Sequence, residues 1–153
     1  MNRSESWSET RREVYTAQFE NLDDIRIFVG KAARDCGLES AQIYAVQLAV
    51  DEASSNIIEH AYGGESQELI ECTCTLTPVS LIITLKDCGT HFDPSQISDP
   101  DLVSDIEGRQ PGGLGLYFMR QLMDEVTFTI VPGQGDVKTC NILTMVKKKE
   151  ERR

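Results

Sequence analysis

With 153 residues and 26% charged side chains, the chain is long enough for one globular domain with its own core. Its 25 Asp and Glu against 15 Lys and Arg leave a formal net charge of −10, which argues against direct nucleic-acid binding and against docking on anionic membranes. The N-terminus has no signal-peptide pattern, and no apolar run approaches the roughly 20 residues of a membrane span, so a cytoplasmic protein is expected.

The first part of the chain predicts one strand and two helices. Residues 14–19 are expected to form a strand. Asn21 is the predicted N-cap and Gly37 the predicted stop of a first helix, between which apolar residues recur at helical spacing. A second, longer helix is predicted to begin at Ser40 and to end near residues 62–64, again with one apolar stripe.

The second part of the chain predicts strands arranged in hairpins. Residues 88–112 are rich in Asp, Ser, Pro and Gly and have weak periodicity, which is typical of a long functional loop, here expected to act as a lid. A third helix is predicted over residues 113–124. The further strands are predicted over residues 69–76, 79–85, 126–130 and 137–146.

This order of elements predicts an α+β fold. Helices cluster early and strands pair as hairpins, which favours a two-layer sandwich with helices on one face of a mostly antiparallel sheet. The domain is expected to span residues 13–147. Residues 1–12 and 148–153 are polar or charged and are expected to be flexible ends.

The cysteines are expected to be reduced and to act as small core residues. There are five, an odd number, and no Cys-x-x-Cys pair occurs, so neither a disulfide framework nor a zinc site is expected. Cys72 and Cys74 lie two apart on a predicted strand and therefore face the same side. The same core role is expected for the others, which are Cys36, Cys88 and Cys140.

Three short stretches have residues suited to chemistry. Glu52 and Asn56 lie four apart on the second helix and so share a face, where a carboxylate and an amide oxygen suit a divalent cation or a positioned hydroxyl. Asp87 follows a strand and can accept a hydrogen bond from a base amine, and Gly89 lets the backbone approach a ligand. Taken singly, the first stretch is more often a solvated helix face and the second more often an ordinary turn.

The third stretch opens the third helix. Gly113, Leu114, Gly115 and Leu116 place glycines at a helix start, where free N–H groups form a phosphate site. The stretch is no P-loop, because no Gly-Lys-Ser/Thr follows, and no Rossmann fingerprint, because no βαβ unit surrounds it.

Taken in order, the three stretches resemble the N, G1 and G2 boxes of the GHKL (Bergerat-fold) ATPases. The resemblance covers residues 14–146 and is strongest to the anti-sigma factor serine/threonine-protein kinases of bacterial partner-switching systems. NIIEHAY, CGTHFDP and GGLGLYFMRQLMDEV are similar to that branch. His91 stands where the wider superfamily often has a second G1 glycine, and the chain has no room for the transducer domains of gyrase-type members.

The resemblance implies a role for each candidate residue. Glu52 would be the general base, and Asn56 would hold the Mg²⁺ that accompanies ATP. Asp87 would bind the adenine amino group, and the backbone of residues 113–115 would bind the phosphates. Arg109 would neutralise γ-phosphate charge. Further nucleotide contacts are implied for Gly89, Phe92, Leu116, Thr139 and His60, although His60 could equally be a helix-end residue.

The implied function is that of an ATP-dependent protein serine kinase. It would phosphorylate an antagonist of the STAS type and would bind and inhibit a sigma factor, as a homodimer without direct contact to nucleic acid. The alternative is a nucleotide-binding interaction module that sequesters a partner with little or no phosphotransfer. A stand-alone ATP hydrolase is a third interpretation, less favoured because small members of the family drive no coupled machine.

Overall fold

The structure is a computed structural model that describes residues 6–90 and 113–150, without the side chains of Gly113 and Leu114. The described elements are β1 (Glu9–Thr16), α1 (Leu22–Cys36), α2 (Ser40–Asn56), β2 (Leu69–Leu76), β3 (Ser80–Asp87), α3 (Gly113–Leu122), β4 (Glu125–Val131) and β5 (Cys140–Lys148). A short 3-10 turn (Phe19–Asn21) precedes α1, and a π-helical turn (Ile57–Ala61) follows α2. None of the described helices is long and apolar enough to cross a membrane.

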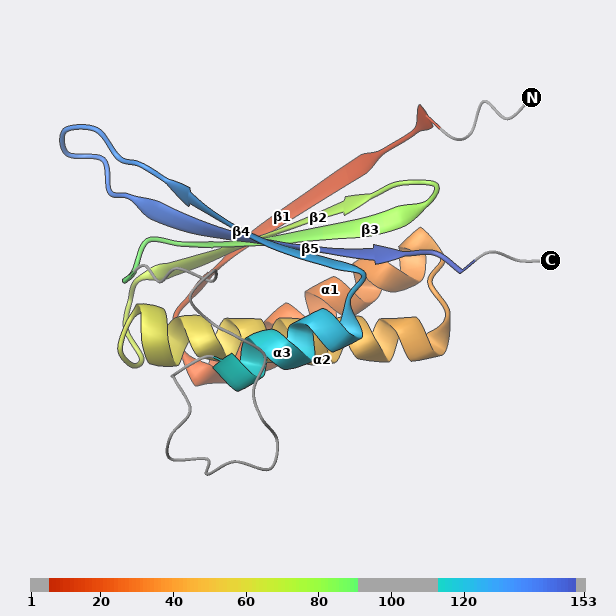
Figure 1. The fold of residues 1–153 in the computed structure, drawn as a ribbon, viewed down its shortest axis with the longest axis horizontal. Coiled ribbons are helices and arrows are strands. Elements are labelled where there is room, and N and C mark those ends of the chain that lie inside the picture. Colours follow the sequence, from red (N-terminus) through yellow and green to blue (C-terminus); the bar gives the residue numbers. More distant parts are fainter. Residues whose placement is uncertain (1–5, 91–112, 151–153) are drawn as a thin grey trace.

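The described strands form one five-stranded antiparallel sheet in the order β1-β2-β3-β5-β4. All three α-helices lie against the same face of this sheet (Figure 1). The helix α2 contacts both α1 and α3. The predicted two-layer α+β sandwich is therefore confirmed.

The core lies between the sheet and the helices. In β2 and β3 buried and half-exposed residues alternate, so that one face of each strand contributes to this core. From Ile70 in β2 and from Leu81 in β3 onward, every second residue is buried, while the residues between them are half-exposed. The fully buried side chains include Ile70, Leu81, Ile83, Leu85, Val46 and Val50. Removing a side chain of this size from water contributes about 1.5–3 kcal/mol, so this interface is a large part of the folding energy.

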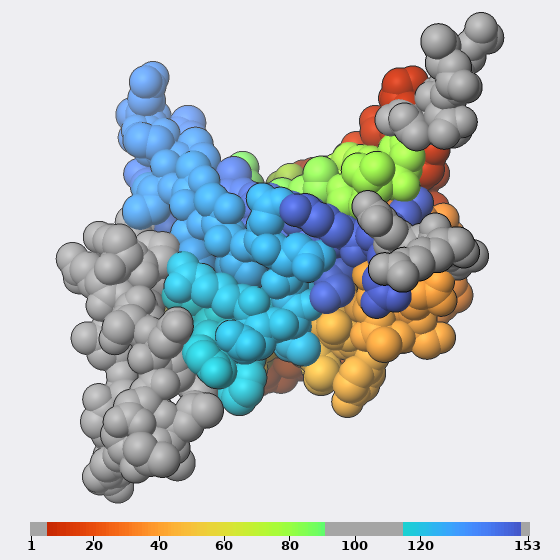
Figure 2. Space-filling view, turned by 45° about the vertical axis from the view of Figure 1, so that its right-hand side comes forward, coloured from red at the N-terminus to blue at the C-terminus, as the bar shows by residue number. Residues whose placement is uncertain are grey.

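The other face of the sheet is largely polar, and none of the helices in residues 6–90 and 113–150 lies over it. Thr73, Thr84, Thr144 and Thr127 are neighbours across β2, β3, β5 and β4, each opposite the next in the strand register. Figure 2 shows this face hollowed between the projecting β4–β5 hairpin and the ends of β1, β2 and β3.

Two predicted strand boundaries are wrong. The strand β1 begins at Glu9 rather than at residue 14 and ends at Thr16, because backbone pairing with β2, from Glu9 opposite Leu76 to Thr16 opposite Leu69, defines it rather than local alternation. The last strand begins at Cys140 rather than at residue 137 and ends at Lys148 rather than at residue 146.

The helix starts are close to the predicted positions, but their causes differ. The Asn21 side chain donates hydrogen bonds of 2.9 Å to the carbonyl and the hydroxyl of Thr16 instead of capping α1. The N-cap of α2 is Glu39, whose capping box with Gln42 replaces the predicted start signal at Ser40. At the end of α1, Gly37 has a left-handed φ of 97°, as the predicted stop requires.

Candidate nucleotide-binding site

The first and third predicted stretches lie against each other where α2 meets the start of α3. A Cβ atom built on Gly115 would lie 2.4 Å from Asn56 Nδ2 and 2.8 Å from Glu52 Oε1. Gly115 itself is buried. A side chain at this position would therefore displace the Asn56 and Glu52 side chains, and with glycine there the first turn of α3 lies beside a carboxylate and an amide.

The carboxylate of Glu52 is not used to hold the fold. Within residues 6–90 and 113–150 it has no ion pair and no side-chain hydrogen bond, and neither has the amide of Asn56; both side chains are half-buried. The adjacent Asp51, by contrast, accepts two hydrogen bonds of 3.1 and 3.2 Å from Arg26. Glu52 and Asn56 thus present polar groups that a ligand can use.

The second stretch lies at the end of β3. Asp87 is 6% exposed, and its Oδ1 accepts hydrogen bonds of 2.9 Å from the Gly89 N–H and from Asn141 Nδ2. Asn141 is the residue opposite Asp87 in the β3–β5 register, and its Nδ2 also approaches the carbonyls of Gly89 and Thr90 at 3.4 and 3.5 Å. The carboxylate is therefore held in one orientation by its own turn and by the neighbouring strand.

The end of β3 also packs against the π-helical turn after α2. A Cβ on Gly89 would lie 2.3 Å from the Ala61 carbonyl oxygen, and the Thr90 N–H donates to that same oxygen at 2.7 Å. Only glycine therefore permits this approach. Since the turn directly continues the helix that carries Asn56, it connects the first and second stretches; π-helical turns of this kind are frequent at functional sites.

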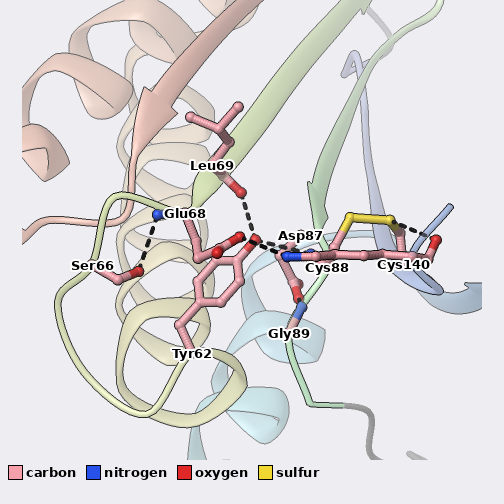
Figure 3. A network of polar contacts seen from close by, with 9 residues as sticks. Tyr62, Ser66, Glu68, Leu69, Asp87, Cys88, Gly89 and Cys140 are labelled. Carbon is pink, nitrogen blue, oxygen red and sulfur yellow. Dashed lines mark hydrogen bonds and ion pairs between the residues drawn. A yellow bond between two sulfur atoms is a disulfide. The ribbon is translucent and has the colours of Figure 1, made fainter. Parts of the chain in front are cut away.

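Tyr62 joins three segments at this point (Figure 3). Its hydroxyl donates to the Leu69 carbonyl at 2.7 Å and accepts from the Cys88 N–H at 2.9 Å. Burial raises the pKa of Tyr62, the Cys88 amide opposes that rise, and the negative charge of Asp87 adds to it. The hydroxyl therefore remains protonated and able to donate.

The structure corrects the prediction for two of the cysteines. Cys88 and Cys140 form a disulfide, which Figure 3 shows beside Asp87 and Gly89. An odd number of cysteines does not exclude a single bridge, and antiparallel pairing of β3 with β5 brings these two residues opposite each other. Cys36, Cys72 and Cys74 are free and buried, as predicted.

The other predicted site residues lie in varied places. Leu116 is 2% exposed and packs into the core, and its predicted contact with a nucleotide stays a prediction. The Thr139 hydroxyl accepts a 3.0 Å hydrogen bond from the Gly133 N–H and closes the β4–β5 loop. The side chain of His60 is 44% exposed, and its Nε2 lies 3.9 Å from Glu59. Its predicted contact with a ligand stays a prediction.

Several predicted features fall where the structure gives no description. Phe92 and Arg109 lie outside the described residues, as do His91 and most of the predicted lid over residues 88–112. Gly113 and Leu114 begin α3, and their predicted phosphate contacts stay a prediction.

Sequence reasoning missed Asn141 and Tyr62. Asn141 is a polar residue inside an apolar strand, and this anomaly was the available signal. Its partner became evident only from the strand register. Tyr62 lies just after the helical segment, where a tyrosine has no distinctive pattern.

Comparison with known proteins shows the family of this chain. Residues 15–147 match the model of the histidine kinase-like ATPase domain. The serine/threonine-protein kinase BtrW of Bordetella bronchiseptica is 32% identical over 85 residues, which cover 56% of this chain and 60% of that protein. The serine-protein kinase RsbW of Listeria monocytogenes is 30% identical over 118 residues, 74% of this chain and 75% of the relative. RsbW of Staphylococcus aureus is 29% identical over 141 residues, 89% of this chain and 86% of the relative.

A solved structure shares the fold. The RsbU and RsbW domains of a Mycobacterium tuberculosis protein superpose with a TM-score of 0.58 at 15% identity, covering 95% of this chain and 35% of the solved one. The relatives named above are called a serine/threonine-protein kinase and serine-protein kinases. On the match over residues 15–147, the chain belongs to the histidine kinase-like ATPase domain family.

Proposed function

We propose that this protein is an ATP-dependent protein serine kinase and anti-sigma factor of a bacterial partner-switching system. It would phosphorylate an antagonist of the STAS type and sequester a sigma factor, acting as a homodimer in the cytoplasm. The observation that carries the kinase assignment is the close approach of Gly115 to Glu52 and Asn56. It sets a carboxylate that has no partner within the described residues beside a helix start suited to phosphate. The STAS antagonist and the sigma factor follow from the resemblance of the three boxes.

The nucleotide would lie across the two parts of the site. Asp87 accepts a hydrogen bond from the adenine amino group, and the backbone N–H groups of residues 113–115 donate to the phosphates. The buried position of Asp87 and its bonds to Gly89 and Asn141 support this role, since a fixed acceptor selects one base.

The residues fit a magnesium ion that binds together with ATP. Such an ion takes one or two protein ligands and completes its coordination with phosphate and water. Within the described part of the chain no cluster of three or more His, Cys, Asp or Glu could hold a metal alone, but Asn56 offers an unpaired amide beside the start of α3. Asn56 would hold the ion, which when bound supplies neutralisation of the phosphate charge.

Glu52 performs the proton transfer. The serine hydroxyl of the antagonist donates a hydrogen bond to the Glu52 carboxylate, and its proton moves to a carboxylate oxygen as the serine oxygen bonds to the γ-phosphorus. The bond between that phosphorus and the bridging oxygen breaks, and ADP leaves. A positioned general base of this kind contributes about 10²- to 10⁴-fold to the rate.

A matched pair of variants tests this assignment. Glu52→Gln and Asp51→Asn each remove one negative charge from adjacent positions of α2, but only Glu52 faces Gly115, whereas Asp51 pairs with Arg26. Transfer of labelled phosphate from ATP to the STAS protein encoded beside the gene should fall about 10²- to 10⁴-fold for Glu52→Gln and stay near wild type for Asp51→Asn. Equal rates for the two variants would refute the role of Glu52.

The second candidate function is a nucleotide-binding module that sequesters a partner without phosphotransfer. The buried and hydrogen-bonded carboxylate of Asp87 favours nucleotide binding under both proposals. If the wild-type protein binds ATP and a sigma factor but transfers no phosphate to any STAS candidate, this second function is correct.

A further inference from the structure

The disulfide lies next to the residues that are proposed to bind adenine. Cys88 directly follows Asp87, the last residue of β3, and Cys140 is the first residue of β5. Asp87 and Asn141 are opposite each other in the strand register. The bridge therefore extends the β3–β5 pairing by one covalent cross-link at the edge of the site (Figure 3).

We propose that Cys88 and Cys140 are a redox-controlled modification site, and that their oxidation to the disulfide tightens nucleotide binding at the adjacent Asp87. This inference rests on the proposed function for the nucleotide, but the thiol chemistry can be tested without it.

The cross-link matters because, within the described residues, only hydrogen bonds otherwise hold the segment 88–90. Each of its three N–H groups has an acceptor, and Asn141 Nδ2 adds long contacts of 3.4 and 3.5 Å to two of its carbonyls. The disulfide restricts the backbone on which Asp87 and the Gly89 turn depend. A site that is already ordered before the ligand arrives binds more tightly, because less freedom is lost on binding.

Cys88 is the most exposed of the five cysteines, so this pair is the one that a dissolved thiol or disulfide can reach. Cys88 is half-buried and so can be reached by a small thiol or disulfide, whereas Cys140 is 8% exposed behind it. In the reduced form the Cys140 thiol can donate to the Lys138 carbonyl, 3.6 Å away. Cys36, Cys72 and Cys74 are at most 3% exposed. A hydrogen bond with Cys74 and then burial raise the pKa of Cys72, which suppresses its thiolate.

The oxidation needs a low-molecular-weight disulfide, R–S–S–R, as the oxidant. The Cys88 thiolate attacks one of its sulfurs, forms a mixed disulfide and releases one thiolate RS⁻. The Cys140 thiolate then attacks the Cys88 sulfur, forms the Cys88–Cys140 bond and releases the second RS⁻. The protein loses two electrons and two protons in all, and the oxidant is reduced to two molecules of thiol. An excess of small thiol reverses both steps.

The test compares the two redox forms of the purified full chain. One sample is equilibrated with glutathione disulfide and the other with dithiothreitol, each freed of the reagent before use. Alkylation after denaturation followed by mass spectrometry should label three cysteines in the oxidised form, the free ones, and all five in the reduced form. Titration calorimetry with ATP and magnesium should then give a dissociation constant roughly 3- to 10-fold lower for the oxidised form.

Variants separate this pair from the other thiols. Cys88→Ser and Cys140→Ser should each hold the affinity at the reduced value in both buffers. Cys36→Ser is the matched control, because a serine hydroxyl can replace the contacts of that thiol with the carbonyls of Thr77 and Ser80 far from the site, so the redox response should persist. Since the main comparison uses wild-type protein, it does not depend on any variant folding.

Each outcome decides the matter. Five labelled cysteines in the oxidised sample, or equal affinities in the two forms, would overturn the inference, and so would weaker binding by the oxidised form. Failure of both forms to bind ATP would overturn the proposed function together with this inference, and this case is recognised because the thiol count would still show the disulfide forming.

Discussion

The two parts of the candidate site differ in how their polar groups are satisfied. Near α2 and α3, the side chains of Glu52 and Asn56 have no polar partner within residues 6–90 and 113–150. Near β3 and β5, the Asp87 carboxylate accepts two hydrogen bonds of 2.9 Å and Tyr62 bridges two segments. One part presents free groups, and the other is a connected network.

This difference matches the tasks that the proposed function gives to each part. A group that exchanges a proton or a metal must be able to change partners, so the fold leaves it free. A group that selects a base must stay in one position, and neighbouring residues hold it there, since binding is tighter and more specific when the site is ordered beforehand. The predictions below test each part in turn.

The largest effect is expected where α3 touches α2. Gly115→Ala would place a Cβ at 2.4 Å from Asn56 Nδ2 and 2.8 Å from Glu52 Oε1, so these two side chains have to shift, and they are the proposed reacting groups themselves. A displacement of about 1 Å can cost about 10²-fold, so phosphotransfer to the STAS protein should fall at least by that factor.

Gly30→Ala is the matched control for this variant. It is also a buried helical glycine, but its added Cβ meets the end of the flexible Gln47 side chain at 2.3 Å, which can move away. Phosphotransfer by Gly30→Ala should stay within about threefold of wild type, because α1 carries none of the proposed reacting groups. Equal losses in the two variants would mean that helix packing in general, and not the contact with Glu52, limits the activity.

A smaller effect is expected at the base-recognition part. Asp87→Asn replaces an acceptor-only carboxylate with an amide, so the adenine amino group loses its partner. An unsatisfied buried polar group costs about 1–3 kcal/mol, which predicts roughly 10- to 100-fold weaker ATP binding and a reduced preference for ATP over GTP. Competition titrations with the two nucleotides measure both quantities, and an unchanged preference would remove Asp87 from base recognition.

Asn141 should have a weaker, indirect effect. Asn141→Ala removes the donor to Asp87 Oδ1 but leaves the Gly89 N–H bond in place. Because Asn141 orients Asp87 rather than the reacting phosphate, we expect the KM for ATP to rise about 3- to 10-fold with kcat nearly unchanged. A fall in kcat with constant KM would instead place Asn141 in the chemical step.

The smallest effect concerns an ion pair outside both parts of the site. The Arg12 guanidinium lies 2.8 Å from Glu71 and, through its hydrogen bond, holds the pKa of that carboxyl below its ordinary value. Because the pKa is lowered in the folded state, the pair stabilises the fold above the unfolded pKa of Glu, and this contribution is lost as the pH falls through the folded pKa.

Arg12→Ala should therefore lower the free energy of unfolding near pH 7 only slightly, since the Arg12 side chain is 58% exposed and water screens the pair, and should have no effect in strong acid. Denaturant titrations at several pH values test the sign, and NMR titration of Glu71 should show its pKa rising in the variant. A destabilisation that grows in acid would contradict this account. ATP binding should not change.

How much could be predicted from the sequence depends on the range of each interaction. The alternation of β2 and β3, the stop at Gly37 and the order of the three stretches are patterns of neighbouring residues, and these predictions were correct for the fold. Glu52 and Asn56 were placed on one helix face by their spacing alone. The contact with Gly115, which unites two of the stretches, was not visible in any local pattern.

The local sequence thus determined which segments are helices or strands and which residue types could bind a nucleotide, because hydrophobic period, glycine positions and polar spacing act over a few residues. Only the tertiary structure decided that β1 begins at Glu9, that Asn21 binds Thr16 and that Cys88 meets Cys140. Strand register and side-chain partners across the sheet join residues far apart in the chain, as the 52-residue separation of the disulfide illustrates. Such pairings are settled by packing of the whole core, for which no short stretch of sequence has a signal.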